Sequence, residues 1–450
     1  MIPEKDLNIT AASLGSPSFK REFNLCYAYA AGGMYMGIAA KELVVKMAKA
    51  GMLGFFGSGG LEIKVIEDAL LYLKSQLTQG QSFGINFLCN HLEAPLMELL
   101  LKHEIRTIEA AAFIQMTPSL VKYRLKGLEP GPDGTILAKN KIIAKISRPE
   151  VARLFLSPAP EQIVTRLLEE NQITQLQANL SESISMADHL CVEADSGGHT
   201  DQGVAYTLMP AMIGVRNEMA GLFPWNKKIC IGAAGGIGTP EAAAAAFILG
   251  ADFILTGSIN QCTIESGASD SVKEMLQDIN VQDTAYAPAG DMFETGAKVQ
   301  VLKKGVFFPA RANKLYSLYR LFPSLDALDE ITKTQLEEKY FKKSFDDVYE
   351  EIRQFHPQAQ IIEADKDPRH KMALVFRWYF GHSTRLALDG DKNRKVDFQV
   401  QCGPALGAFN QWVKGTPLED WRNRHVDDIG IKIMEETAQL LNRRFSCLCA

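Results

Sequence analysis

The sequence contains no uninterrupted apolar run long enough to cross a membrane. Its most apolar stretch, Ala242 to Leu255, is broken by Gly250 and Asp252. The first residues, Met1 to Asp6, lack the basic segment followed by an apolar run that marks a secretory signal. We therefore expect no membrane contact and no leader peptide.

Cysteine patterns typical of metal sites are missing as well. The eight cysteines include no CxxC pair, and no histidine stands at a spacing that suggests zinc. Cys447 and Cys449 lie at the tail, where an exposed position without a role is the simplest interpretation. We expect no metal site, and we expect the protein in a reducing cytoplasm.

Positive charge is not in excess. The formal net charge is −5, which argues against a general nucleic-acid binder. Of the 450 residues, 46% are apolar and 22% are charged, ordinary values for a soluble globular protein. A (β/α)8 barrel needs roughly 250 residues, so the length predicts one large domain and a second, smaller body.

Internal repeats and two nucleotide-binding motifs are also absent. No GxGxxG sequence opens a helix after a strand, and no Walker A sequence occurs. A separate dinucleotide domain is therefore not expected, and a phosphate bound here should belong to a mononucleotide cofactor.

What the sequence does contain, between about residues 25 and 255, is an alternation of short apolar runs with longer amphipathic ones. The short runs are almost continuously apolar, which fits strands buried on both faces. Such alternation predicts an α/β fold, either a closed barrel or a doubly wound sheet. The eight runs are Leu25–Ala31, Met52–Phe56, Phe83–Leu88, Ile105–Phe113, Ile142–Ile146, His189–Ala194, Ile229–Ala233 and Phe253–Thr256.

One helix is placed closely by its capping residues. Thr239, Pro240 and Glu241 are typical of an N-cap, a first helical position and an acid near the positive helix end. The helix is predicted to run through Ala242–Leu249 and to end at Gly250.

Beyond Phe322 glycine becomes rarer and charge increases. Asp367 and Pro368 predict the start of a helix that runs through Phe380, and an amphipathic pattern predicts a last helix over Val426–Asn442. We therefore expect a barrel domain over residues 1–322 and a mainly helical C-terminal domain over residues 323–450.

Glycine-rich loops follow four of the predicted strands, at the end where a barrel carries its active site. Glycine lets a flat or anionic ligand approach the backbone closely. For one loop alone an ordinary tight turn is the simpler interpretation, but four together indicate a bound cofactor. The loops are Ala31–Met34, Gly54–Gly60, Asp195–His199, and Ala234–Gly238 paired with Thr256–Ser258.

The last pair of loops is the most informative. Late-strand loops and a helix N-terminus form the usual phosphate site of a barrel. The backbone N–H groups of Gly236, Gly238, Gly257 and Ser258 could all point at one phosphate.

Two side chains are candidates for chemistry. His199 follows two glycines directly after a predicted strand, and imidazole titrates near neutrality, which suits proton transfer or polarisation of a carbonyl. A lone histidine is more often structural or exposed. Lys145 lies inside the run Ile142–Ile146; it either places a cation beside a flavin or snorkels at the strand end.

In order and spacing these motifs resemble the nitronate monooxygenase-like flavin barrels across about residues 25–262. That superfamily includes flavin-dependent enoyl reductases of bacterial fatty acid synthesis. The resemblance implies a (β/α)8 TIM barrel that binds FMN. The matching motifs are Gly32-Gly33-Met34, Gly54–Gly59, Asn86 within Gly84–Phe87, Gly197-Gly198-His199, Ala233–Ile237 and Thr256–Ser258.

Longer stretches resemble a narrower group, the trans-acting enoyl reductases of polyketide and polyunsaturated fatty acid synthases (the PfaD family). One departure is Gln202–Val204, where the family has an Asn-Arg-Pro-like run, so substrate contacts in this loop are not carried over. The similar stretches are Val192–Asp201, Asp291–Glu294, Lys298–Leu302, Arg311–Tyr316 and Cys402–Ala405.

This resemblance implies reduction of the α,β-double bond of an enoyl thioester on an acyl carrier protein, with hydride from NADPH or NADH passing through FMN. Polyketide synthase modules are the implied partners, and a homodimer is a family-level expectation. His199 and Lys145 are our candidates for the catalytic residues. The implied cofactor contacts are Gly32, Gly33, Met34, Asn86, Lys145, Gly197, Gly198, Gly235, Gly236, Gly238, Gly257 and Ser258.

Two other interpretations stay open. A nitronate monooxygenase would share the FMN barrel and the Gly-Gly-His loop but use oxygen, and the long C-terminal motifs weigh against it. A non-catalytic scaffold would keep the barrel as an interaction module, and the intact glycine loops with His199 weigh against that.

A basic stretch offers a docking surface for the carrier protein, since such carriers are generally acidic. Aspartate and glutamate are absent from residues 298–320. A solvated face is the commoner meaning of such a stretch. Its basic residues are Lys298, Lys303, Lys304, Arg311, Lys314 and Arg320.

Overall fold

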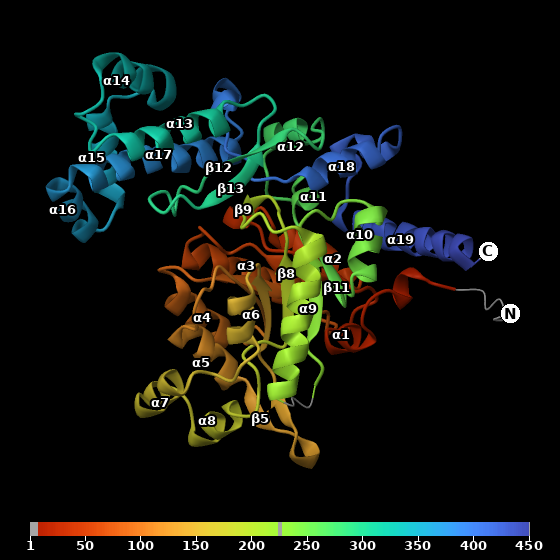
Figure 1. Cartoon of the computed structure of the whole chain (residues 1–450). Helices are drawn as coiled ribbons and strands as arrows, with labels where there is room; N and C mark the ends of the chain where they lie inside the picture. Colours follow the sequence, from red (N-terminus) through yellow and green to blue (C-terminus); the bar gives the residue numbers. More distant parts are fainter. Residues whose placement is uncertain (1–7, 224–226, 450) are drawn as a thin grey trace. The chain divides into compact units, whose positions relative to one another are not determined.

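The computed structural model describes residues 8–223 and 227–449, which form two compact units (Figure 1). The first unit holds the described residues of Met1–Asp195, Gln202–Gly267 and Trp412–Ala450. The second holds Ser196–Asp201 and Ala268–Gln411. The chain thus leaves the first unit twice, once for a short loop segment and once for a long one.

Eight parallel strands close into a barrel in the first unit. Each coincides with one of the eight apolar runs, so the predicted barrel is confirmed and the doubly wound alternative is wrong. Almost every strand residue is buried, which explains why the runs are continuously apolar. In order around the barrel the strands are β1 Tyr29–Ala31, β2 Leu53–Phe56, β3 Gly84–Leu88, β4 Thr107–Ala111, β7 Lys141–Ile146, β8 His189–Glu193, β10 Cys230–Ala234 and β11 Phe253–Thr256.

Helices surround these strands, and Figure 1 shows α4, α5, α6 and α9 on their outer side. A small antiparallel hairpin of β5 (Leu128–Pro130) and β6 (Ile136–Ala138) is inserted before β7. The helices of this unit up to β11 are α1 Pro17–Glu22, α2 Lys41–Lys49, α3 Ile63–Gln76, α4 Glu93–Lys102, α5 Pro118–Lys126, α6 Pro149–Phe155, α7 Glu161–Glu169, α8 Gln175–Ser181, α9 Ala205–Leu222 and α10 Pro240–Ile248.

The predicted helix after Thr239 is confirmed as α10. The Thr239 side chain accepts a hydrogen bond from the N–H of Ala242 at 3.4 Å, and Pro240 opens the helix. Gly250, with a φ of +99°, follows just beyond its C-terminal end, where only glycine adopts this conformation readily.

Helix α1 closes the end of the barrel where the strands begin. Phe19 stacks on Phe253, the first residue of β11, with ring centroids 4.1 Å apart. The carboxylate of Glu22 lies 3.0 Å from His189 and 2.9 Å from Lys141, the first residues of β8 and β7. The mouth of the barrel at this end is therefore covered by packed and paired side chains.

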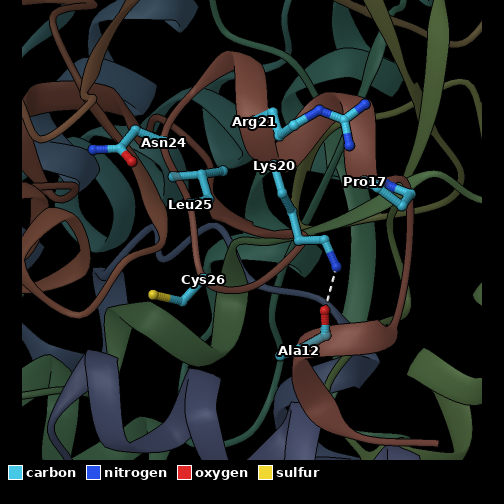
Figure 2. A pocket seen from close by; sticks show the side chains of 7 residues that line it. All are labelled: Ala12, Pro17, Lys20, Arg21, Asn24, Leu25 and Cys26. Atoms are coloured by element: carbon cyan, nitrogen blue, oxygen red, sulfur yellow. Dashed lines mark hydrogen bonds between the residues drawn. The ribbon is translucent and has the colours of Figure 1, made fainter.

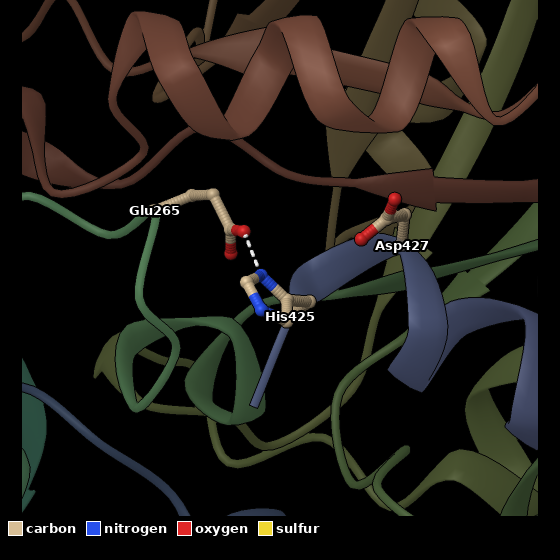
Figure 3. Close-up of side chains that lie close together, drawn as sticks. All are labelled: Glu265, His425 and Asp427. Carbon is tan, nitrogen blue, oxygen red and sulfur yellow. Dashed lines mark hydrogen bonds and ion pairs between the residues drawn. The ribbon is translucent and has the colours of Figure 1, made fainter. Parts of the chain in front are cut away.

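The C-terminal helix, α19 (Val426–Cys449), returns to the barrel unit and packs along α10. Figure 3 shows how its first turn is held, with His425 turned toward Glu265. Glu265 contacts Nδ1 of His425 at 2.5 Å and accepts the N–H of Val426 at 3.1 Å. The carboxylate thus caps the helix N-terminus. The predicted last helix is confirmed, and it extends to Cys449.

The second unit is built on a three-stranded antiparallel sheet in the order β12-β13-β9. Aromatic side chains fill its core, including Phe293, Phe308, Phe376 and Phe380. Its strands are β9 Gly198–His199, β12 Thr284–Pro288 and β13 Lys298–Leu302. Its helices are α12 Asp270–Leu276, α13 Phe308–Leu321, α14 Glu330–Leu336, α15 Phe345–Phe355, α16 Gln358–Lys366, α17 Pro368–Asp389 and most of α18 Pro404–Trp412.

The helix predicted at Asp367 is confirmed as α17, since the Asp367 side chain accepts the N–H of Arg369 at 2.9 Å. The sheet and the return of α19 were not predicted. The limits of the two compact units differ from the expected domain limits, 1–322 and 323–450. The division into a barrel domain and a helical C-terminal domain at these residues stays a prediction. Among the described residues, no helix is both long and apolar enough to cross a membrane.

Candidate active site

A hydrogen bond crosses the interior of the barrel at the carboxyl end of its strands. The N–H of Gly33, just after β1, donates to Oε2 of Glu109 on β4 at 3.1 Å. Strands β1 and β4 are separated by β2 and β3 in the closed order, so this bond spans the lumen. A methyl group at Gly33 would lie 2.4 Å from Cβ of Asn86, and glycine is therefore needed for this close approach.

Glu109 brings together residues from three further positions around the barrel. Its Oε2 also accepts the amide N–H of Asn86 at 2.7 Å, and its Oε1 lies 4.0 Å from Nζ of Lys145 on β7. Lys145 is 3.7 Å from a carboxylate oxygen of Glu193 on β8. The lysine thus stands between two carboxylates, and its side chain is only 15% exposed. This excludes the snorkelling interpretation.

The charges of this cluster depend on one another. Burial raises the pKa of Glu109 above its ordinary value, and Lys145 and the hydrogen bond from Asn86 offset only part of that rise. Burial lowers the pKa of Lys145, but the charges of Glu109 and Glu193 outweigh burial and raise this pKa above its ordinary value. The two carboxylates therefore favour the charged, ammonium form of Lys145.

A second feature lies at the ends of the neighbouring strands β10 and β11. Gly236 follows β10 with a φ of +74°, and Gly257 follows β11. A methyl group on either glycine would meet no atom within 4 Å, so the backbone here borders open space. The N-terminus of α10, capped by Thr239, follows the first loop. These are the properties expected of a cradle for an anionic group, at the place the sequence predicts.

His199 lies in the second unit, not in the barrel unit. It forms part of β9, where it pairs with Val299 of β13, and its side chain is 49% exposed. Nε2 of His199 lies 2.8 Å from Oδ1 of Asp291. Gly197 and Gly198 belong to the same segment of the second unit.

The structure therefore joins some of the predicted site residues directly and not others. Gly33, Asn86 and Lys145 meet through Glu109, while Gly236 and Gly257 follow adjacent strands. The remaining barrel candidates are neighbours of these in the chain: Gly32, Met34, Gly235, Gly238 and Ser258.

Sequence reasoning missed Glu109, Glu193 and Asp291. A signal for Glu109 was present, because an acid stands inside the otherwise apolar run Ile105–Phe113, and a buried acid needs a partner. The same signal was present for Glu193, an acid inside the run His189–Ala194, while Asp291 stood only in the stretch Asp291–Glu294 that resembles the enoyl reductases.

A separate pocket of about 400 Å³ lies beside α1, and Figure 2 shows Lys20, Arg21 and Cys26 among its lining residues. Lys20 donates to the carbonyl of Ala12 there. Because α1 covers the start of the strands, this pocket lies at the opposite end of the barrel from the cluster around Glu109.

Two family models match the chain. One, described as nitronate monooxygenase, covers residues 18–303. The other, described as the inserted helical domain of acyl-carrier-protein S-malonyltransferase, covers residues 322–398.

Named relatives extend over almost the whole chain. The polyketide biosynthesis protein PksE of Bacillus subtilis (strain 168) is 60% identical over 444 residues, which are 98% of this chain and 58% of PksE. The polyketide biosynthesis protein ThaF of Burkholderia thailandensis is 54% identical over 432 residues, 96% of this chain and 37% of ThaF. The chain thus spans 58% or less of these two relatives.

Solved structures are also similar. The enoyl reductase domain of MlnA, from the macrolactin biosynthesis cluster of Bacillus amyloliquefaciens, is 48% identical with a TM-score of 0.95, over 97% of this chain and 99% of that one. FabK of Thermotoga maritima, at 18% identity and a TM-score of 0.56 over 95% of this chain and 98% of that one, shares the fold.

The buried cluster predicts a pH-dependent loss of stability in Lys145→Met. Without the lysine, the buried carboxylate of Glu109 loses its cationic partner, which should cost about 3–5 kcal/mol of unfolding free energy at pH 8. Glu109 has a raised folded-state pKa, so it takes up a proton as the pH falls, and the loss should shrink at pH 5. Urea denaturation of the parent and the variant at pH 5 and pH 8 measures this loss of unfolding free energy.

As a control, Lys139→Met removes an exposed pair with Glu129 and should change stability by less than about 1 kcal/mol. The double variant Lys145→Met/Glu109→Gln should recover part of the loss. Equal losses in Lys145→Met at pH 5 and pH 8 would contradict the described pairing.

Proposed function

We propose that the chain, which belongs to the nitronate monooxygenase family, is a trans-acting enoyl reductase of polyketide or polyunsaturated fatty acid biosynthesis. It would reduce the α,β-double bond of an enoyl thioester carried on an acyl carrier protein. The observation that carries the proposal is the 48% identity to the enoyl reductase domain of MlnA, over nearly the full length of both chains. The free thiols of the described cysteines accord with a reducing cytoplasm as its location.

The barrel residues fit a bound flavin mononucleotide. The open backbone at Gly236 and Gly257 suits its phosphate, and Lys145 with Asn86 offers a cation and an amide to its ring system. Oε1 of Glu109 is buried and has no hydrogen-bond partner in the part of the chain that is described, so the cluster has an acceptor to spare. When bound, FMN would accept hydride from NADPH or NADH and supply it to the β-carbon of the enoyl group.

His199 is our candidate for the protein's own part in the chemistry. Negative charge develops on the thioester carbonyl as the β-carbon is reduced, and the α-carbon needs a proton. An imidazole can donate a hydrogen bond to that oxygen or the proton to that carbon. His199 is half exposed, which leaves the ring accessible to a substrate.

A second candidate function is the oxidation of nitronates, which the description of the family model favours. It would use the same cofactor with oxygen instead of an enoyl thioester. The two functions differ in what reoxidises the reduced cofactor, and this difference can be measured.

The basic stretch is proposed as the docking surface for the carrier protein. Arg311 pairs with Asp397, and Lys304 donates to the carbonyl of Asp278 at 2.5 Å, so these two are partly committed. The remaining basic residues are exposed and form no ion pair with any residue in the described ranges: Lys298, Lys303, Lys314 and Arg320. The match of residues 322–398 to a domain of an acyl-carrier-protein transferase adds support.

Gly236→Val should yield folded protein without FMN. The side chain would project into the open space where the phosphate is proposed. Flavin content after purification, read from visible absorbance per mole of protein, measures the effect. Gly80→Val is the matched control, because Gly80 has the same left-handed φ, +76°, and also borders open space. Stoichiometric FMN in a folded Gly236→Val protein would remove the phosphate from this loop.

His199→Ala should leave FMN binding and reduction by NADPH intact but slow the reaction with substrate. The parent protein should consume NADPH with an enoyl thioester and release the saturated product, identified by mass spectrometry. Reoxidation of the reduced variant by the same thioester should be slower by roughly 10²-fold or more, the scale of a lost proton donor or oxyanion partner. An unchanged rate would exclude His199 from the mechanism.

Reversing charge at Lys303 and Lys304 to glutamate should raise KM for a carrier-bound enoyl substrate, most clearly at low salt. Turnover of the same acyl group on a small thiol should barely change. Lys49→Glu/Lys126→Glu, which makes the same charge change at exposed helical positions outside residues 322–398, should affect neither substrate. If both substrates or neither suffer in the first variant, the docking surface lies elsewhere.

A further inference from the structure

The backbone that carries His199 is fixed on several sides within the second unit. His199 pairs with Val299, and the N–H of Thr200 donates to the carbonyl of Lys298 at 3.2 Å. Gly198 has a φ of +89°, and a methyl group there would lie 3.0 Å from the side-chain oxygen of Gln401. These contacts therefore fix the backbone position from which the imidazole side chain of His199 extends.

The backbone around Asp291, the partner of this imidazole, is also fixed within the second unit. It stands in the turn between β12 and β13, where the N–H of Ala289 donates to the carbonyl of Ala297 at 2.7 Å. Gly290, the residue before it, packs so closely that a methyl group there would lie 2.7 Å from Cβ of Phe380. Phe293, two residues after it, is 1% exposed in the aromatic core. The turn is anchored on both sides of the aspartate.

The two side chains influence each other electrostatically. Burial raises the pKa of Asp291, but the hydrogen bond and the charge of His199 outweigh burial, and Arg377 adds to them, so this pKa lies below its ordinary value. Such coupling is reciprocal, because the interaction that favours the carboxylate equally favours the imidazolium.

We propose that Asp291 is the positioning residue for His199, in an aspartate–histidine pair that orients the ring and keeps it protonated for its role in the enoyl reduction. This rests on the proposed function, and nothing in the similarities assigns a role to Asp291. A carboxylate can only accept hydrogen bonds. The neutral ring therefore keeps its proton on Nε2, toward Asp291, and the negative charge favours the doubly protonated ring.

The test compares Asp291→Asn, which keeps the size of the side chain and removes its charge, with the parent holoprotein. Proton-detected NMR of the histidine ring titrates His199 directly, with its signal assigned by its loss in His199→Gln. The pKa of His199 should fall by roughly 0.3 to 0.7 unit, the scale of an exposed ion pair. The alkaline limb of the reoxidation profile with an enoyl thioester should move to lower pH by the same amount.

Two further variants separate this role from a general effect on the turn. Asp291→Glu keeps the negative charge. In this variant the pKa of His199 and the pH profile of flavin reoxidation should stay close to those of the parent. Glu294→Gln removes an equal charge three residues along, from a pair with His370, and should leave both at the parent's values. Reduction of the flavin by NADPH should not change in any of them.

The proposal is overturned if His199 titrates alike in Asp291→Asn and the parent, or if Glu294→Gln shifts it as much. A different result concerns the proposed function. If the parent holoprotein is reduced by NADPH but not reoxidised by enoyl thioesters, while the pKa of His199 still responds to Asp291, the pair stands and the enoyl reductase assignment falls.

Discussion

A single buried carboxylate organises the functional end of the barrel. Glu109 has no exposed surface, and a buried charge is tolerated only when it is paired and hydrogen-bonded. Its partners come from the loop after β1, from β3 and from β7. Satisfying one charge therefore fixes the approach of Gly33, the orientation of the Asn86 amide and the position of Lys145. Because a buried carboxylate without these partners would destabilise the fold, the three residues are held in place.

The candidate residues are divided between the two compact units of the chain. The barrel unit holds the open glycine loops at the ends of β10 and β11 and Lys145 between its two carboxylates. The second unit supplies His199, which the chain carries out of the barrel unit just after Asp195 and returns before Gln202. We propose that the first unit binds the cofactor and that His199 of the second unit takes part in the proton chemistry.

Much of this architecture could be predicted because its causes are local. Continuous apolar runs mark strands covered on both faces, and the caps at Thr239 and Asp367 mark helix starts that the structure reproduces. The features that could not be predicted depend on contacts between residues far apart in the sequence. No local pattern tells that His199 pairs with Asp291, or that Glu265 caps α19. Lys145 shows both cases. Its strand could be predicted from the local sequence, but the position of its ammonium group depends on Glu109 and Glu193, which lie on other strands.

In the proposed function, the reduced cofactor delivers its electrons to an enoyl thioester. The most direct measurement of this step is an anaerobic stopped-flow experiment, in which the protein is reduced with one equivalent of NADPH and then mixed with an enoyl thioester on a carrier protein. We expect full return of the oxidised flavin absorbance within the time of steady-state turnover. A flavin that stays reduced with every enoyl thioester, yet is reoxidised by oxygen while a nitronate is consumed, would contradict the proposed function and identify a nitronate monooxygenase instead.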